Sequence, residues 1–238
     1  MTDNVTATNL VQQVQQGWQE LEARRKATGR QCGNCTLCCR LLGVDAPPVM
    51  SKPPNTNCQH CTPGRGCGIY DHRPTQCRTY HCLWLIDPTF DDAFYPAKSH
   101  FVISIVDDGR GGDGVAAIVE VDPHRPDSWL RTPYLERISQ VALRLPSSTV
   151  RVGRRWFKLF SCEVAKHPEL ISVKWGAGDG GRVLPGHVGP NYIKTVAGDF
   201  EWLEIEPPAA FFDAWRITDE HEVEAAAKLF EAMQALST

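Results

Sequence analysis

Nine of the ten cysteines of this chain lie between residues 32 and 82. Two C-x2-C steps run from Cys32 through Cys35 to Cys38, and a third joins Cys58 to Cys61. A two-residue spacer lets one backbone turn bring both sulfurs to the same metal ion. This repeated spacing, with more cysteines close by, predicts metal or metal–sulfur ligation. The candidate metal ligands are Cys32, Cys35, Cys38, Cys39, Cys58, Cys61, Cys67, Cys77 and Cys82.

Two other uses of closely spaced cysteines fit the sequence less well. A disulfide framework is typical of secreted proteins, but the chain begins with the polar stretch MTDNVTATNL and shows no secretory signal. A redox-active C-x2-C needs a thioredoxin-like βαβ pattern around it, and we find none. We therefore expect a cytoplasmic protein with reduced thiols that bind metal.

The adjacent pair Cys38–Cys39 indicates how the ligands divide. In a helix, Cys32, Cys35 and Cys39 would share one face and Cys38 would lie to one side, whereas neighbours in a strand point to opposite faces. Adjacent cysteines therefore favour two centres, or one thiol outside the first coordination shell. Nine thiolates would fill two tetrahedral sites and leave one spare.

The identity of the metal stays open between zinc and iron. Closed four-cysteine sites suit structural zinc, while C-x2-C-x2-C with a remote fourth cysteine also holds iron–sulfur clusters in bacterial ferredoxins. The Cys-Pro ending of the ferredoxin motif is absent here. His81 would share a helical face with Cys77 if Pro74 begins a short helix, which makes it the first histidine candidate. His60 and His72 are weaker candidates, and for all three histidines a role outside the metal's direct ligands or at the surface fits better.

CGNCTLCC (Cys32–Cys39), followed by CGIYDHRPTQCRTYHCLW (Cys67–Trp84), resembles the YkgJ-like cysteine-cluster family, also described as CxxCxxCC proteins. These are bacterial proteins regarded as zinc- or iron-chelating domains. The resemblance covers about residues 31–86 and implies metal chelation without naming a reaction. A related cysteine pattern in a flagellin lysine methylase implies that an iron–sulfur cluster is an option. The matching downstream positions are Cys67, Ile69, Tyr70, Arg73, Pro74, Cys77, Arg78 and Tyr80.

Composition excludes several function classes. The chain has 238 residues, of which 42 % are hydrophobic and 22 % charged, with a formal net charge of −3. Its basic residues are scattered, so we expect no nucleic-acid partner. No run of about 18 apolar residues occurs, so we expect no membrane span. Arg73 and Arg78 lie beside cysteines, where guanidinium charge would offset that of thiolates.

The pattern along the chain predicts an α+β fold rather than a doubly wound sheet. We expect an N-terminal amphipathic helix within residues 1–30, a loop-rich metal-binding domain over 31–90, and an α+β region over 91–238 packed against it. That last region should contain strands at 101–106 and 114–121, a helix at 132–146, a hairpin around Gly153 and a strand at 200–206. A C-terminal helix should begin near Thr218.

Three further features have plain structural explanations. The glycine-rich stretches at 109–114 and 175–186 read as a hairpin turn and a loop, because no helix can follow the second one. Cys162 stands far from the other cysteines and should be a buried structural thiol. Besides a metal-binding protein whose metal is mainly structural, we keep two alternative hypotheses for the function. One is an iron–sulfur-dependent enzyme with redox or methyl-transfer chemistry. The other is a metal-stiffened module that binds a protein partner.

Overall fold

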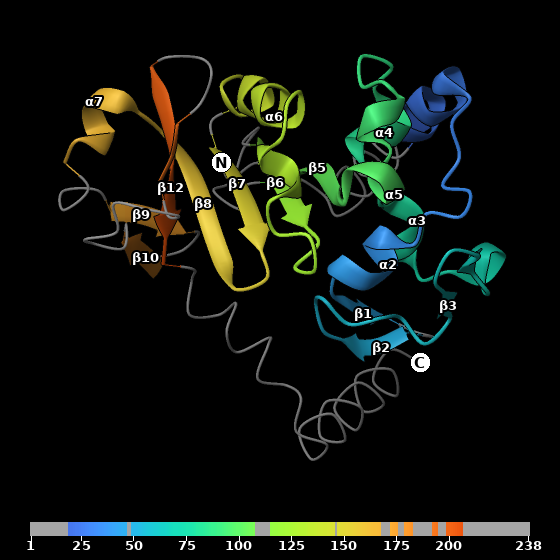
Figure 1. Ribbon diagram of the computed structural model, residues 1–238. Helices are drawn as coiled ribbons and strands as arrows, with labels where there is room; N and C mark the ends of the chain where they lie inside the picture. The colour runs from blue at the N-terminus through green and yellow to red at the C-terminus, as the bar shows by residue number, and fades with distance from the viewer. Residues whose placement is uncertain are drawn as a thin grey trace, which may run out of the picture.

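The computed structural model of the chain describes residues 19–46, 49–107, 115–145, 147–167, 172–175, 179–182, 192–194 and 199–206 (Figure 1). It has an α+β fold, as the sequence predicts. The expected C-terminal helix, the turn at 109–114 and residues 8–18 of the expected first helix lie outside these ranges. Residues 19–28 are helical, and this helix ends at Gly29, whose φ of +66° is a conformation that glycine adopts readily.

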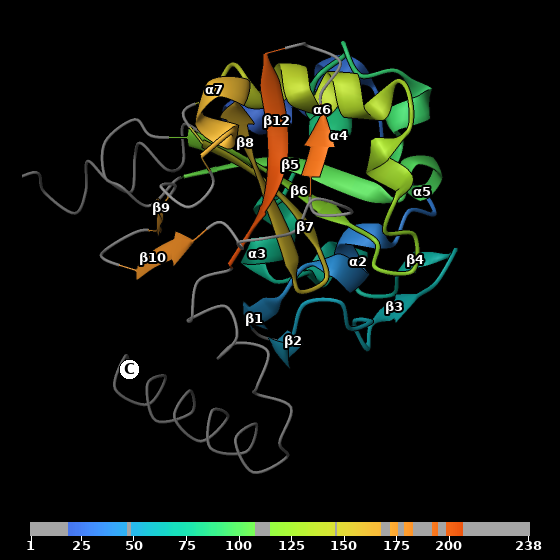
Figure 2. The same cartoon turned by 60° about the vertical axis from the view of Figure 1, so that its left-hand side comes forward.

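Within the described part of the chain, six strands form one sheet in the order β11-β12-β8-β7-β6-β5 (Figure 2). The predicted strands and the hairpin around Gly153 are confirmed, and Gly153 has a φ of +60° at the turn. The strand bounds are β5 Phe101–Asp107, β6 Val115–Val121, β7 Ser147–Val152, β8 Arg155–Ser161, β11 Tyr192–Lys194 and β12 Phe200–Ile205.

One pairing in this sheet is parallel, between β6 and β7, and the connection between them contains helix α6 (Tyr134–Ala142). A parallel pair needs such a crossover, because a tight turn can only reverse the chain. Helix α6 is shorter than the predicted 132–146: it ends at Ala142, and a turn at 143–145 leads toward β7. Ile138 of α6 is almost fully buried, and the indole nitrogen of Trp202 donates a hydrogen bond of 3.1 Å to Ser139.

The two faces of the sheet differ in chemistry. The face under α6 carries the main apolar core, which includes Phe101, Val119, Val150, Phe157 and Trp202. On the opposite face, β5, β6 and β7 carry the polar residues Ser104, Glu120 and Arg151 beside apolar ones such as Val102 and Ile118. This second face, which we call the polar face for its three polar residues, therefore combines polar and apolar positions.

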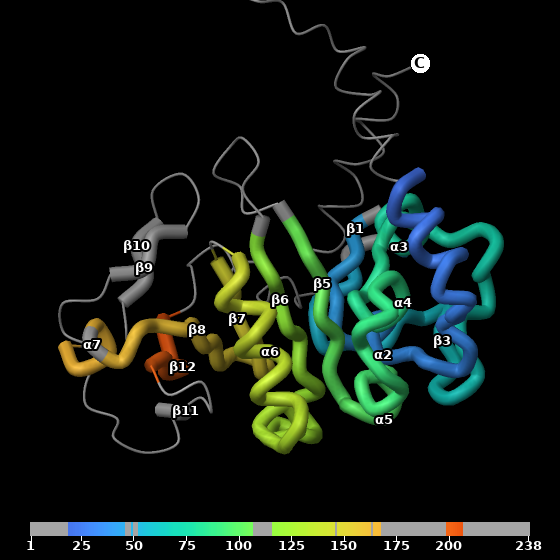
Figure 3. The backbone as a smooth tube through the Cα atoms, turned by 90° about the horizontal axis from the view of Figure 1, so that it is seen from above, coloured from blue at the N-terminus to red at the C-terminus, as the bar shows by residue number. Residues whose placement is uncertain are grey.

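The cysteine-rich segment lies beside β5, at the edge of the sheet (Figure 3). It consists of short elements joined by turns, as the density of Pro, Gly and Asn predicts. Helices α2 and α4 both contact β5. The bounds are α2 Leu37–Leu41, β1 Val44–Ala46, β2 Val49–Lys52, β3 Cys61–Thr62, β4 Gly66–Cys67, the 3-10 turn Tyr70–His72, α3 Thr75–Thr79 and α4 Leu83–Ile86.

Arg30 ties the two ends of this segment together. Its guanidinium donates hydrogen bonds to the carbonyls of Trp84, Asp87 and Phe90, and it lies 5.0 Å from the Trp84 ring. Thr28 adds a hydrogen bond of 2.8 Å to the carbonyl of Leu85. The start and the end of the cysteine-rich segment are thus held side by side by contacts that involve no cysteine.

Smaller elements complete the described structure. Two 3-10 turns, Asp92–Phe94 and Ser128–Leu130, and helices α5 (Pro96–Ser99) and α7 (Cys162–Ala165) surround the sheet. Strands β9 (Ser172–Trp175) and β10 (Asp179–Arg182) form a hairpin, so part of the predicted glycine-rich loop is a strand. Glycine can pair there because the ladder uses only backbone groups. None of the described helices has the length and apolar character needed to cross a membrane.

Candidate metal centre

Two of the C-x2-C steps, Cys32–Cys35 and Cys58–Cys61, form the backbone turn that their spacing predicts. The amide of Cys35 donates to the carbonyl of Cys32 at 2.9 Å, and the amide of Cys61 donates to that of Cys58 at 3.0 Å. In the first turn Gly33 has a φ of +54°, which a residue with a side chain adopts only with strain. A turn of this kind is the local geometry by which C-x2-C motifs bring two sulfurs to one ion.

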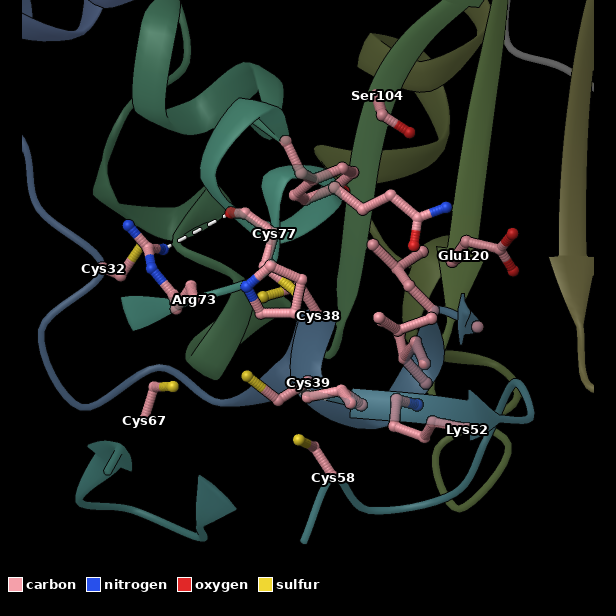
Figure 4. Close-up of a pocket in the computed structure, with 18 of the residues that line it drawn as sticks. Cys32, Cys38, Cys39, Lys52, Cys58, Cys67, Arg73, Cys77, Ser104 and Glu120 are labelled. Atoms are coloured by element: carbon pink, nitrogen blue, oxygen red, sulfur yellow. Dashed lines mark hydrogen bonds between the residues drawn. The ribbon is translucent and has the colours of Figure 1, made fainter. Parts of the chain in front are cut away.

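A cavity of about 380 Å³ lies between the cysteine-rich segment and the polar face of the sheet. In Figure 4 the sulfurs of Cys39, Cys58 and Cys67 turn toward the same space. Residues of β5, β6 and β7 form its far wall. The cysteines that line it are Cys32, Cys35, Cys38, Cys39, Cys58, Cys67 and Cys77.

A second cavity of about 40 Å³ adjoins the first and reaches toward the main core. Cys82 lines this small cavity but not the large one, and Trp84 and Tyr95 close it. Tyr95 is fixed there because its hydroxyl donates to the carbonyl of Cys32 at 2.9 Å. The cysteines that line both cavities are Cys32, Cys35, Cys38 and Cys77.

Packing divides most of the cysteines into two groups. Cys35 and Cys82 both pack on the small apolar cluster of Leu37, Leu41 and Val102, and Cys82 also packs on the main core together with Cys32. The negative charge that Cys32 and Cys35 would carry as thiolates is felt at Cys82, where it raises the pKa further. We call Cys32, Cys35 and Cys82 the first thiol group.

The second thiol group lies on the other side of α2. Cys58 is buried with Val44 and Val49, and the cysteines packed against this cluster are Cys39, Cys61 and Cys77. Cys67 joins them, because it stands opposite Cys61 in the β3–β4 pair. The group is therefore Cys39, Cys58, Cys61, Cys67 and Cys77.

The adjacent residues Cys38 and Cys39 lie between the two thiol groups. Cys39 lines only the large cavity, whereas its neighbour Cys38 lines both. Cys61 of the second group acts to lower the pKa of Cys39, and Cys38 acts to raise it, so Cys39 lies close to both thiols. Adjacent positions on α2 thus face different surroundings, as expected for neighbours on a helix.

The electrostatics of the metal-free thiols oppose ionisation. Burial raises the pKa of Cys35 to about 11 and the pKa values of Cys61 and Cys82 to about 12. The interaction of the Cys39 thiol with Cys38, burial, and the charge that Cys38 would carry as a thiolate together raise the pKa of Cys39. Without a cation these thiols stay neutral near pH 7, so a metal that binds thiolates must displace their protons.

Lys52 is a basic residue beside the thiols that the sequence analysis missed. Its side chain is only 7 % exposed, and its ammonium group donates to the carbonyls of Arg40, Pro53 and Thr56 at 2.8 to 3.3 Å. Burial lowers the pKa of Lys52, while the charges of Cys58 and Cys39 as thiolates act to raise it. An anionic centre in the second thiol group would therefore keep this lysine charged.

The two arginines expected to offset thiolate charge behave differently. Arg73 lines both cavities, donates to the carbonyl of Tyr70 at 2.9 Å, and lies 3.7 Å from the Tyr70 ring. Its charge lowers the pKa of Cys32 against the larger raising effect of burial. Arg78 is exposed and bonds to Thr75, so the expectation is wrong for this residue.

The histidine candidates do not line either cavity. Helix α3 begins after Pro74, as predicted, but it ends at Thr79 and does not carry His81 onto the face of Cys77. Nδ1 of His81 lies 2.9 Å from the carbonyl of Thr79, and Nε2 lies 3.5 Å from Glu22. His60 contacts Gln59, and His72 is exposed.

As arranged here, no three His, Cys, Asp or Glu side chains of the described ranges converge closely enough to hold an ion. All ten cysteines are free thiols. Rotation about χ1 moves a cysteine sulfur between staggered positions, so each thiol has more than one sulfur position available to it. The donor set of soft sulfur atoms fits zinc or an iron–sulfur cluster. Cys162, predicted to be buried, is partly exposed at the start of α7.

Comparison with family models, with curated proteins and with solved structures finds no match to this chain.

Proposed function

We propose that the protein binds zinc or iron, the latter as an iron–sulfur cluster, through its nine clustered cysteines. The observation that carries this proposal is the packing of these cysteines in two thiol groups beside adjoining cavities, which eight of the nine line. Cys38 joins the first thiol group to complete a set of four ligands. The second thiol group offers five, which is one more than a tetrahedral site uses.

The metal has a mainly structural role in this proposal. Between residues 39 and 77 the segment contains only short elements and few buried apolar side chains. A segment of that kind needs another source of stability, and the free energy of metal binding becomes folding free energy. The resemblance of Cys32–Cys39 and Cys67–Trp84 to CxxCxxCC proteins supports the same function. Reduced thiols in this number agree with a cytoplasmic location.

The test is to purify the protein without oxygen and to measure zinc, iron and acid-labile sulfide per chain. We expect two metal centres per chain. Zinc without colour would identify structural zinc sites, whereas iron with equimolar sulfide and a broad absorbance band near ~400 nm would identify iron–sulfur clusters. A protein that contains neither metal, and that takes up neither when supplied with Zn²⁺ or with Fe²⁺ and sulfide, would disprove the proposal.

A further inference from the structure

The large cavity contains more space than one closed tetrahedral metal site requires. In a closed tetrahedral site the four sulfurs enclose the ion at about 2.3 Å, so the ion and its ligands leave little room between them. The cavity measures about 380 Å³, which falls within the range of about 300–1,000 Å³ typical of small-molecule sites. It also extends past the thiols to the sheet, where Ser104 and Glu120 lie (Figure 4).

The walls of this cavity combine an apolar body with one polar end. The apolar side chains come from both the cysteine-rich segment and the sheet, and include Leu42, Val49, Ile69, Val106 and Ile118. At the sheet end, Ser104 stands directly opposite Ile118 in the β5–β6 pair, and Glu120 stands opposite Arg151 in the β6–β7 pair. This combination is typical of a site that holds an amphipathic molecule in one orientation.

The carboxylate of Glu120 can accept more hydrogen bonds than Arg151 donates to it. Arg151 donates from Nη1 to Oε1 of Glu120 at 2.8 Å, and no residue of the described ranges donates to Oε2. The Glu120 side chain is 15 % exposed. Burial raises the pKa of Glu120, although the charge of Arg151 acts in the opposite direction. A second positive group at Oε2 would therefore stabilise this carboxylate.

We propose that the large cavity binds a small amphipathic organic cation, with its ammonium group on Glu120 and Ser104 and its apolar body along Ile118 and Val106 toward the thiols. This inference rests on the proposed function, because metal-bound thiolates supply part of the negative charge that selects a cation. The hydroxyl of Ser104 donates a hydrogen bond to the carbonyl of Ile118 at 3.5 Å, and its lone pairs can accept one from the ligand.

An anion is the poorer ligand for the same site. It would meet Glu120 at one end and thiolates at the other, since seven cysteines line the cavity. Two cations of the lining are already engaged: Lys52 donates to three carbonyls and has no proton left for an anion, and Arg73 donates to the carbonyls of Tyr70 and Cys77. Arg151 directs its Nη1 to Glu120, and its guanidinium carbon lies 4.1 Å from the Trp156 ring.

The experiment measures binding of n-hexylamine, 1-hexanol and hexanoate to the full, metal-loaded chain by isothermal titration at pH 7.5, where n-hexylamine carries a positive charge. Three variants accompany the wild type. Glu120→Gln removes the charge of the polar end, and Ile118→Trp fills the cavity. Ile105→Trp is the matched control, because Ile105 is an exposed residue of the neighbouring strand on the opposite face. Metal content is measured for every sample.

We expect saturable 1:1 binding of n-hexylamine that is at least about tenfold tighter than binding of hexanoate. Glu120→Gln should weaken n-hexylamine binding about tenfold or more and leave 1-hexanol unchanged, and Ile118→Trp should abolish both. Ile105→Trp should bind like wild type.

Three results would overturn the inference: no saturable binding to metal-loaded protein, equal affinity for the amine and the carboxylate, or amine binding unaffected by Glu120→Gln and Ile118→Trp. Because metal content is measured separately, a protein that holds two centres but fails these tests disproves the cation site alone. A chain that holds no metal disproves the proposed function instead.

Discussion

The amide of Cys58 donates a hydrogen bond of 3.1 Å to the carbonyl of Cys39, so these two cysteines are neighbours in space although they lie far apart in sequence. This contact places Cys39 beside Cys58, whereas its neighbour Cys38 lines both cavities. Residues 38 and 39 can consequently serve different centres, and this relationship determines which substitutions should affect which metal.

We expect single cysteine substitutions to remove one metal centre and to spare the other. Cys82→Ser should abolish the centre of the first thiol group, because that group has no spare thiol. Cys58→Ser should abolish the centre of the second, because Cys58 is the buried thiol against which Cys39, Cys61 and Cys77 pack. The metal content measured per chain should fall by one centre in each purified single variant, and the double variant should bind no metal. Cys162→Ser, outside both groups, serves as the control. Loss of all metal in either single variant would indicate one shared centre.

Lys52→Met should weaken metal binding at the second thiol group. The buried ammonium group offsets thiolate charge, and the loss of such a supporting residue typically lowers metal affinity about 10- to 100-fold. Competition with a chromophoric chelator would measure this change. Lys98→Met, at an exposed position of α5, should leave affinity unchanged. An equal loss at both centres would instead point to general unfolding of the segment.

Metal removal should loosen the middle of the cysteine-rich segment more than its ends. Cys39, Cys58 and Cys77 lie in a small cluster away from the main core, whereas Cys32 and Cys82 pack directly on it. Hydrogen exchange of the metal-free protein should therefore rise most between residues 39 and 77. The pair β7–β8 should keep its protection. Unchanged exchange in the middle of the segment would show that metal does not stabilise it.

The metal-free protein should lose stability as the pH rises above about 9. A thiol whose pKa is higher in the folded than in the unfolded chain stabilises the fold below its unfolded pKa of 9.0, and this contribution disappears as the pH passes the folded value. For Cys35, with a folded pKa of about 11, the full loss is about 2–3 kcal/mol.

Urea unfolding at pH 7.5 and at pH 10.5 would measure the difference. The metal-loaded protein provides the comparison, because its ligands are already thiolates and its stability should change less over the same interval. A metal-free protein that is equally stable at both values would show that the thiols are less buried than their positions here indicate.

Strong local signals made much of the fold predictable. Gly29 ends the first helix and Gly153 turns the β7–β8 hairpin, and both have positive φ values that glycine tolerates. The parallel β6–β7 pair was not predictable in this way, because strand partners joined through a helix leave no trace in local periodicity. Strand β10 was missed because Asp-Gly-Gly-Arg lacks the branched and aromatic residues that mark strands.

In the candidate site, too, residues in local motifs could be predicted from the sequence, and residues brought in by the fold could not. Cysteine spacing alone was enough to select the thiols as candidate metal ligands, because C-x2-C is a local motif and its turn forms from neighbouring residues. Lys52, Ser104 and Glu120 carried no such signal. Each becomes relevant only when the fold brings its strand or loop against the thiols. The position of Arg78 failed as a prediction because a short helix turned it to solvent.

The hydrogen bonds of Arg30 join the two ends of the cysteine-rich segment, so the segment is a closed loop. These hydrogen bonds, to Trp84, Asp87 and Phe90, hold the two ends of the loop together without help from any thiol. Loop closure entropy depends on whether the ends are joined, and only weakly on the length between them. When a metal leaves, the thiols of a tethered loop stay at high local concentration. Reloading is then a rearrangement within a confined loop, and its rate should not depend on refolding of the chain.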